Sequence, residues 1–478
     1  MTSFARSTTD SQPPELTRAL GPRDVLLYFI TAGTNLQWVA VAAAAGPSSI
    51  VVWVLGGLAM FLPLAVCVVY LSAHHPDHGG LYVWSKRAFG PFAGFLTGWL
   101  FWTSNLPYFP GLLYFAAGNA LFLTSSDAAR ELAQTPAYFV IFALLGLALA
   151  TVLNVTGLGL AKQLSNAGAY ARSALIVLIT AIALVVYVNH GSATQITPTT
   201  LLPGFGLEQL LFWSTIAFAW TGAESASFMG GEIRDPRRTV PRALAAAAPI
   251  IAAIYIVGTL SVLVTVPSGE SDSLYGIMQA VTEGAERLGL TGVVPVAALL
   301  VTIACLGSVG AWLGSVARIP FVAGVDRFLP PSFAHLHPRW RTPVTALVLQ
   351  ATIAALFVFL GQAGTTVKGA YEVLISMMVI AVLMPFLFLF SAAIKLSATP
   401  TPGVQVRIPG GRTTVVLMAV VGLATTAGSI ILAAIPRPDE ANKLLAITKI
   451  VGSTSLMLAI GVAIYAVGTH RARRRERA

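Results

Sequence analysis

Long apolar runs separated by short polar segments recur along this chain of 478 residues. A run of about 20 apolar residues is long enough to cross a bilayer as an α-helix. We count twelve such runs, and each predicts one membrane-spanning helix. The chain is therefore predicted to be an all-α membrane protein with twelve transmembrane helices. The predicted spans are residues 24–45, 48–71, 91–123, 136–154, 162–189, 207–231, 241–266, 291–323, 342–361, 370–396, 412–435 and 445–468.

Composition supports the same class. Charged residues make up 10% of the chain and hydrophobic residues 56%, whereas a soluble protein carries roughly 25% charged residues. Residues 1–23 are polar and contain Pro13 and Pro14, so they lack the apolar core of a cleavable signal peptide. Cys67 and Cys305 both fall in predicted spans, and we expect them to be small core residues and not a disulfide.

The net charge of +10 is distributed unevenly between the two sides of the predicted membrane. If both termini lie on one side, that side holds 22 of the 29 Lys and Arg residues and the opposite side holds 6. Positive residues accumulate on the cytoplasmic side, which predicts an inner-membrane protein with both termini in the cytoplasm. The basic tail, residues 469–478, is expected to anchor the last helix at anionic headgroups, and nucleic acid is not an expected partner.

The sixth predicted span is irregular. It reads Phe218-Ala-Trp-Thr-Gly-Ala-Glu224 and runs into a basic, proline-bearing loop that ends at Pro241. A charge inside a membrane span is costly and marks a functional site by default. A glycine-interrupted span is typical of a transporter binding site, where freed backbone groups face a cavity.

The first predicted span carries a polar cluster at its centre, with Thr31, Gly33, Thr34, Asn35 and Gln37 in an otherwise apolar helix. Such residues can also serve as contacts between helices. Their place matches that of the break in the sixth span if the chain contains two inverted halves of five spans each, and this pairing favours a cavity.

This interpretation divides a single transporter domain, residues 24–468, into repeat one (24–189), repeat two (207–396) and two accessory helices (412–468). Residues 1–23 and 469–478 form cytoplasmic tails.

Three motifs resemble those of the amino acid–polyamine–organocation transporters. The stretch His75-Pro-Asp-His-Gly-Gly-Leu-Tyr-Val-Trp84, followed by Phe89-Gly-Pro-Phe-Ala-Gly-Phe95, resembles their loop and third helix. Residues 218–241 resemble their sixth helix and its loop, and residues 307–312 resemble their eighth helix. The resemblance covers residues from about 20 to about 440 and implies a LeuT-type fold.

Within that superfamily, the sequence most resembles the bacterial glutamate/GABA antiporters, because of Phe29-Ile-Thr-Ala and Val406-Arg-Ile-Pro-Gly-Gly411. The arginine/agmatine antiporters are a second near relative. Members often carry Gly-x-Gly in the first helix, whereas residues 31–37 here contain one glycine. The position of the first break is therefore left open.

A zwitterionic amino acid must exchange its hydration for hydrogen bonds in the site. Its carboxylate suits free N–H groups and the positive end of a half-helix, and its ammonium suits unwound carbonyl oxygens. The substrate-binding residues predicted from the two breaks are Thr31, Ala32, Gly33, Thr34 and Asn35 in the first span and Phe218, Ala219, Trp220, Thr221 and Gly222 in the sixth.

The resemblance adds roles for two aromatic residues. Phe218 matches an aromatic residue that closes over the substrate, and Trp312 is similar in position to one that touches the substrate side chain. Either ring could instead pack ordinarily. The glycines around Trp312, at Gly307, Gly310 and Gly314, favour a closely approached helix face.

Two charged residues are candidates for coupling or gating. Glu224 could carry a proton, or it could brace two helices by hydrogen bonding. Arg172 resembles the position at which sodium-independent members place a lysine in the site that binds sodium in coupled relatives. Because an arginine keeps its proton, Arg172 would be a fixed cation; the alternative is that it reaches toward the cytoplasmic surface.

The function predicted is a secondary active transporter that moves amino acids by alternating access, through sodium-independent exchange. The alternative is a polyamine or cationic amino acid importer coupled to protons. The expected partners are a small amino acid or amine substrate and the lipid bilayer, and a homodimer is left open. No enzyme activity, cofactor or metal site is predicted, since His74, His75 and His78 have no carboxylate or cysteine set beside them.

Overall fold

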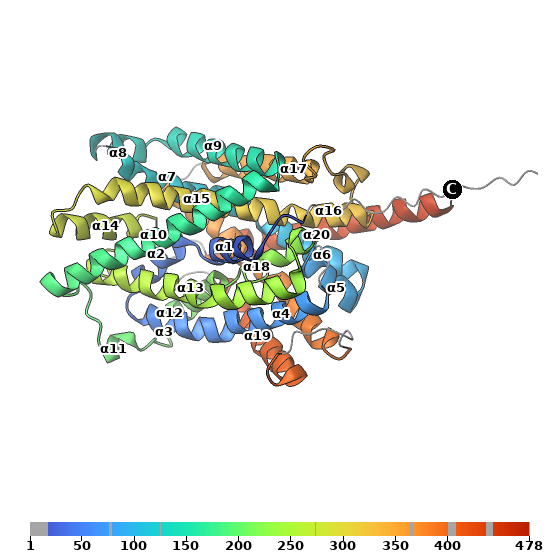
Figure 1. Ribbon diagram of the computed structural model, residues 1–478, viewed down its shortest axis with the longest axis horizontal. Coiled ribbons are helices and arrows are strands. Elements are labelled where there is room, and N and C mark those ends of the chain that lie inside the picture. The colour runs from blue at the N-terminus through green and yellow to red at the C-terminus, as the bar shows by residue number, and fades with distance from the viewer. Residues whose placement is uncertain are drawn as a thin grey trace, which may run out of the picture.

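The computed structural model describes residues 18–75, 79–124, 126–272, 274–362, 367–399, 408–435 and 443–477. Within these ranges the regular structure is helical, and the sole pairing of extended backbone is an isolated bridge between Leu20 and Ile233. Figure 1 shows the long helices side by side in one bundle, with the short helices α8, α11 and α14 at one end and α5, α16 and the end of α20 at the other. The all-α prediction is confirmed for these residues.

The helices follow the predicted runs in order. They are α1 (Pro22–Gly33), α2 (Leu36–Ala44), α3 (Ser48–Gly56), η1 (Gly57–Phe61), α4 (Leu62–His74), α5 (Leu81–Phe89), α6 (Pro91–Ser104), α7 (Tyr108–Ala120), η2 (Leu121–Leu123), α8 (Ser126–Ala133), α9 (Pro136–Val155), α10 (Leu158–His190), α11 (Pro198–Leu201), α12 (Leu207–Ala219), η3 (Ser225–Glu232), α13 (Pro236–Thr265), α14 (Gly276–Arg287), α15 (Val293–Val316), α16 (Arg318–Val325), η4 (Pro331–Ala334), α17 (Val344–Gln362), α18 (Val367–Leu396), α19 (Gly411–Ala433) and α20 (Lys443–Arg477).

Many of these helices have the length and composition of membrane spans. In the described residues, eight helical segments are long and apolar enough to cross a bilayer, and shorter apolar helices cover 207–219, 344–359 and 380–396. The outward-facing side chains are often apolar; Leu145 on α9 and Val177 on α10 are 66% and 69% exposed. Apolar residues at such positions suit a lipid environment, and the architecture is that of a multi-pass membrane protein.

Several boundaries differ from the predicted ones. The third predicted span is divided between α6 and α7 just before Tyr108, where Pro107 interrupts the helix. The segment predicted as a loop after the sixth span is mostly helical, because α13 already begins at Pro236, a residue that suits the first position of a helix. Helix α20 continues to Arg477, through the predicted tail. Residues 1–17, Val406 and Arg407 lie outside the described residues.

The centre of the scaffold is the contact between α10 and α15. A Cβ atom added to Gly168 would lie 2.7 Å from the Cα atom of Gly307, so the two backbones touch at this point. Only glycine permits such an approach. The contact brings Arg172, one turn along α10, next to Ser308 on α15.

Candidate functional site

The first helix is broken in the middle of the bundle. Helix α1 ends at Gly33, and α2 begins at Leu36. Between them, Thr34 (φ −133°, ψ 131°) and Asn35 (φ −125°, ψ 124°) are extended. Trp38 N–H donates to Asn35 O at 3.1 Å, and the N–H groups at the start of α2 carry the positive end of its dipole. This break is therefore suited to an anionic group.

A second break follows α12, which ends at Ala219. The backbone turns at Gly222, where φ is 117°, and resumes as the 3-10 helix η3 at Ser225. A residue with a side chain rarely adopts this φ value. The glycine that interrupts the predicted sixth span is thus required by the geometry of the turn.

The two breaks lie directly against each other. A Cβ atom added to Gly222 would lie 2.8 Å from Gly33 Cα and 2.9 Å from Ala32 O. The hydroxyl of Tyr255 on α13 joins them further: it accepts a hydrogen bond from Asn35 N–H at 3.1 Å and lies within donating distance of Gly33 O (3.2 Å) and Ala219 O (3.0 Å). One tyrosine therefore supports both unwound segments.

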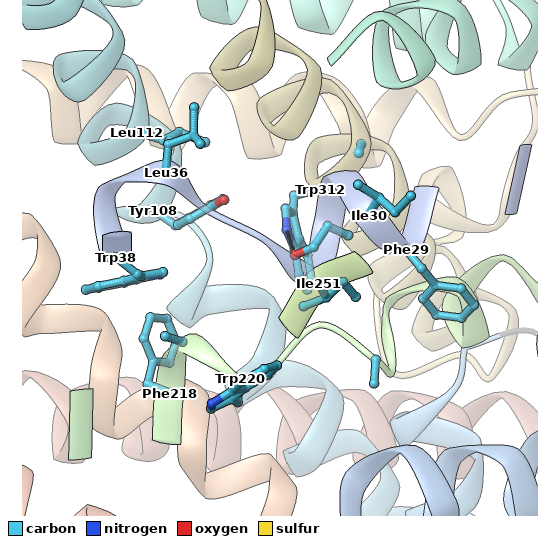
Figure 2. Packing of buried hydrophobic residues seen from close by; sticks show 14 of the residues in the cluster. Phe29, Ile30, Leu36, Trp38, Tyr108, Leu112, Phe218, Trp220, Ile251 and Trp312 are labelled. Carbon is cyan, nitrogen blue, oxygen red and sulfur yellow. Dashed lines mark hydrogen bonds between the residues drawn. The ribbon is translucent and has the colours of Figure 1, made fainter. Parts of the chain in front are cut away.

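A small central cavity of about 30 Å³ lies beside the breaks. This volume holds water-sized molecules only. Aromatic rings form much of its wall, and Trp38 meets Phe218 edge-on with ring centroids 5.4 Å apart; Figure 2 shows these two rings next to each other. The other aromatic residues of the wall are Phe101, Tyr108 and Trp312.

The polar groups of the central cavity are partly engaged. Asn35 Oδ1 accepts a hydrogen bond from Tyr108 at 2.8 Å, and Trp312 Nε1 donates to Ala32 O at 3.2 Å. Glu224 Oε2 accepts from Gly222 N–H at 2.9 Å, whereas Glu224 Oε1 is fully buried and has no partner in the described structure. A carboxylate oxygen is thus left free at the cavity wall.

The carbonyl groups at the end of α12 already accept hydrogen bonds. Phe218 O accepts from Thr221 N–H at 3.0 Å and from its hydroxyl at 2.8 Å. Ala219 O lies 3.0 Å from the Tyr255 hydroxyl. A carbonyl oxygen has two lone pairs, so Ala219 O retains capacity for a further donor.

Arg172 on α10 joins this helix to α1 and α15, close to the first break. It is 1% exposed. One arm of its guanidinium donates to the carbonyl oxygens of Ile30 (3.3 Å) and Thr31 (3.0 Å) on α1, and the other donates to Ala304 O (3.2 Å) and Ser308 Oγ (2.6 Å) on α15. The guanidinium reaches these groups and not the surface.

A buried ion pair joins η3 to the start of α16, at the end of the bundle that carries the C-terminus (Figure 1). Arg318 Nη2 and Nε donate to the two carboxylate oxygens of Glu232 at 2.8 and 3.0 Å, and both side chains are buried. Arg318 also donates to Gly314 O. Arg318 lies near the end of the predicted span 291–323, and its bidentate partner holds it inside the protein.

A second ionic contact lies at the same end, between α5 and the end of α16. Lys86 Nζ is 2.6 Å from Asp326 Oδ2, and the Tyr82 hydroxyl donates to the same oxygen at 2.5 Å. Burial, with the adjacent Asp326 carboxylate, raises the pKa of Tyr82. The hydroxyl therefore stays protonated and remains a donor.

The predicted binding residues separate into two groups. Six of them line the central cavity, together with the coupling candidate Glu224: Ala32, Asn35, Phe218, Ala219, Thr221 and Trp312. The others lie behind it. Thr31 donates to Ser165 O, Thr34 turns back to Ile30 O, and Trp220 donates to Trp53 O, while Gly33 and Gly222 form the contact between the breaks.

Sequence reasoning missed Trp38, Phe101, Asn105, Tyr108 and Val382 in the cavity wall. Asn105 and Tyr108 are polar residues on either side of Pro107 in an apolar run, and this pattern could have indicated that they line a cavity. Tyr255 lies in an aliphatic span and gives no comparable signal. The histidine cluster is described in part: His75 O accepts from Trp84 Nε1 at 3.0 Å, and His78 lies outside the described residues.

Comparison with known proteins places this geometry in context. A family model described as amino acid permease matches residues 24–471. A Legionella pneumophila protein described as an uncharacterized transporter is 27% identical over 426 residues, which cover 88% of this chain and 90% of the relative. Uncharacterized transporters of Mycobacterium bovis and Mycobacterium tuberculosis are 30% identical over 366 residues, which cover 72% of this chain and 74% of each relative.

Proposed function

The chain belongs to the amino acid permease family, and from that membership we propose that it exchanges amino acids across the cytoplasmic membrane by alternating access. The family is one of transporters and not of enzymes. The observation that carries the proposal is the pair of helix breaks that meet at Gly33 and Gly222. Broken helices facing a cavity are how transporters expose backbone groups to a substrate inside the membrane.

We further propose twelve spans, with two inverted halves of five helices and both termini in the cytoplasm. The matching positions of the breaks after α1 and α12 support the inverted repeat. The excess of Lys and Arg on one side supports the orientation. In this orientation the Glu232–Arg318 pair lies on the cytoplasmic side of the central cavity, and the Trp38–Phe218 contact lies on the outer side.

The substrate carboxylate would bind at the N-terminus of α2, beside Asn35, where N–H groups and the helix dipole favour an anion. Its ammonium would bind between Ala219 O and Glu224 Oε1. The central cavity of 30 Å³ is too small for an amino acid, so binding requires the Trp38–Phe218 contact to open. Trp312 would then face the substrate side chain.

Sodium independence is the proposal that rests on Arg172. Its guanidinium donates hydrogen bonds to the carbonyl oxygens of Ile30 and Thr31 and to Ser308 Oγ on α15. A sodium ion at this place would meet a fixed positive charge at close range, which is strongly unfavourable when both are desolvated. The guanidinium of Arg172 would thus provide the positive charge that a bound sodium ion provides in sodium-coupled transporters.

The test is transport by the purified protein in liposomes, with a panel of radiolabelled amino acids and polyamines outside. Exchange predicts rapid uptake with amino acid inside, and little uptake without it. Replacing sodium by choline should leave the rate unchanged. A requirement for sodium would refute the role of Arg172, and uptake of none of the panel would refute the substrate class.

The alternative is a proton-coupled importer of polyamines or cationic amino acids. Glu224 Oε1, buried and without a partner in the described residues, favours it because it offers a proton or cation acceptor. Glu224→Gln separates three roles of this carboxylate. A proton carrier predicts that the variant loses pH-dependent net uptake and keeps exchange, whereas a structural brace predicts that both activities persist. Loss of both in a folded variant would indicate direct contact with the substrate, as the ammonium site proposed above requires.

A further inference from the structure

A large groove opens on the side of the bundle, away from the central cavity. It lies between α6, the segment 324–335, α17 and α20, and we call it the lateral groove. Its volume is about 1110 Å³, at or above the upper end of small-molecule pockets, which run from about 300 to 1,000 Å³. A ligand that fills it is much larger than an amino acid.

Two contacts fix α20 at one side of the lateral groove. Trp99 Nε1 on α6 donates to Met457 O at 2.8 Å. Nearer the C-terminus, a Cβ atom added to Gly468 would lie 2.5 Å from Phe328 O, so the helix backbone rests on the segment after α16. The lateral groove is therefore bounded by packed elements, and its width is set by the protein.

The wall of the lateral groove is apolar at membrane depth. Leu349 on α17 and Ile460 and Val467 on α20 are 37%, 44% and 50% exposed. Two polar side chains in this wall are already hydrogen-bonded within the protein: Trp102 Nε1 donates to Gln350 Oε1 at 2.8 Å, and Thr103 Oγ1 donates to Trp99 O at 2.8 Å. The described part of this wall therefore offers mainly hydrocarbon contact to a ligand.

The charge is concentrated at the end near the C-terminus, where Arg327 and Arg471 line the lateral groove. In the described structure neither guanidinium has an ion pair or a hydrogen-bond partner. The acidic neighbour of Arg327, Asp326, is already occupied by Lys86 and Tyr82. Two uncompensated cations thus stand at the mouth of an apolar groove.

The position of Arg327 is fixed by the end of α16. Arg327 N–H donates to Gly324 O at 2.9 Å and Phe328 N–H donates to Ala323 O at 3.0 Å, the pattern of a Schellman cap. Arg327 occupies the left-handed position of this cap with φ 66°, where glycine is the usual residue. The backbone therefore holds a cation at a place where a side chain is costly.

We propose that the lateral groove binds one anionic phospholipid, with its acyl chains along α17 and α20 and its headgroup phosphate at Arg327 and Arg471. Charge complementarity selects this occupant, because the apolar wall meets two free cations at one end only. That end faces the cytoplasmic leaflet in the orientation proposed above, where anionic lipids attract basic residues. The inference rests on that orientation and not on amino acid transport.

The experiment is native mass spectrometry of the purified full-length protein in detergent. Dioleoylphosphatidylglycerol and dioleoylphosphatidylcholine are added separately, so that the chains are the same and only the headgroup differs. The wild type should retain the anionic lipid at concentrations on the order of tenfold lower than the zwitterionic lipid. Arg327→Gln/Arg471→Gln should remove this preference.

Matched variants control for charge and folding. Arg237→Gln/Arg242→Gln, at the exposed start of α13, removes the same charge elsewhere and should keep the preference. Arg327→Gly removes the cation and relieves the left-handed strain, so it should weaken anionic lipid binding without lowering the melting temperature in detergent.

Two further double variants test the apolar part of the lateral groove. Leu349→Trp/Ile460→Trp should reduce binding of both lipids, whereas Leu145→Trp/Val177→Trp on the lipid-facing surface of α9 and α10 should not. Equal retention of the two lipids by the wild type would overturn the proposal, as would an unchanged preference in the Arg327→Gln/Arg471→Gln variant. A dimer that dissociates when the lateral groove is filled would identify a second copy of the chain as the occupant and would also overturn it.

Discussion

The contact between the two helix breaks can be tested with Gly222→Ala. This substitution has a steric cost and a backbone cost, and the structure allows the two to be separated. In Gly222→Ala, the new Cβ atom meets backbone, with Gly33 Cα at 2.8 Å and Ala32 O at 2.9 Å. Backbone cannot rotate away as a side chain can. The residue must also keep φ near 117°, which alanine rarely adopts.

The magnitudes of these two costs can be estimated separately. A residue with a side chain in a sparsely populated backbone region costs about 1–3 kcal/mol. Forcing extra volume into a packed site costs about 1–3 kcal/mol more. Gly222→Ala should therefore cost roughly 2–6 kcal/mol and separate α1 from the end of α12. Because both breaks shape the central cavity, substrate binding should fail before the fold does.

Gly157 supplies the matched control. Its φ is 131°, and nothing lies within 4 Å of an added Cβ atom. Gly157→Ala carries the backbone cost alone, about 1–3 kcal/mol. Gly33→Ala is the opposite control, because it adds a steric contact without the left-handed backbone cost. Its new Cβ atom would lie 2.9 Å from the flexible end of the Ile251 side chain, which can move.

The assay is substrate exchange in liposomes beside thermal unfolding in detergent. Gly222→Ala should lose nearly all exchange, and both controls should retain most of it. If Gly157→Ala were as inactive as Gly222→Ala, backbone conformation alone would account for the loss and the contact between the breaks would not matter. Wild-type exchange by Gly222→Ala would refute the reasoning entirely.

Three further predictions follow from the site. Glu232→Gln leaves Arg318 as a buried charge without a charged partner and should destabilise the protein by about 3–5 kcal/mol; adding Arg318→Gln should recover part of this in thermal unfolding, and no recovery would show that the two side chains act independently. Tyr255→Phe removes the hydroxyl that joins both breaks and should cost about 1–3 kcal/mol, with weaker substrate binding at an unchanged expression level; unchanged affinity contradicts it. Trp312→Ala should alter the ranking of substrates in the radiolabel panel more than it lowers transport of the smallest one, and an unaltered ranking would assign the indole to packing.

The sequence predicted the helical runs and the second break well, because both are local properties. An apolar run needs only neighbouring residues, and Gly222 with Glu224 interrupts one such run visibly. The first break was left open since its one glycine, Gly33, ends α1, and the extended residues are Thr34 and Asn35. Ordinary side chains occupy that extended backbone without strain, so no special residue marks it.

The contacts that the sequence could not supply connect distant segments. Asn35 meets Tyr255, which lies 220 positions further along, and Glu232 meets Arg318 across 86 positions. Each partner alone has an ordinary interpretation: a tyrosine among aliphatic residues, and an arginine near a helix end. Tertiary packing decides which polar groups in the first break face the central cavity, whereas Thr34 turns back to Ile30 O through a local bond to α1.

The role proposed for Arg172, as a fixed cation in place of sodium, has a thermodynamic consequence for transport. A sodium ion carried inward across a potential of 100 mV contributes about 2.3 kcal/mol to uphill transport, equivalent to roughly a fiftyfold accumulation ratio. A cation that is part of the polypeptide returns with every cycle, so its net displacement over a cycle is zero and it draws nothing from the ion gradient. Under exchange, the inside-to-outside concentration ratio of one amino acid is then limited by the inside-to-outside ratio of the other. The amino acid that the cell holds in excess therefore decides the direction of net flow.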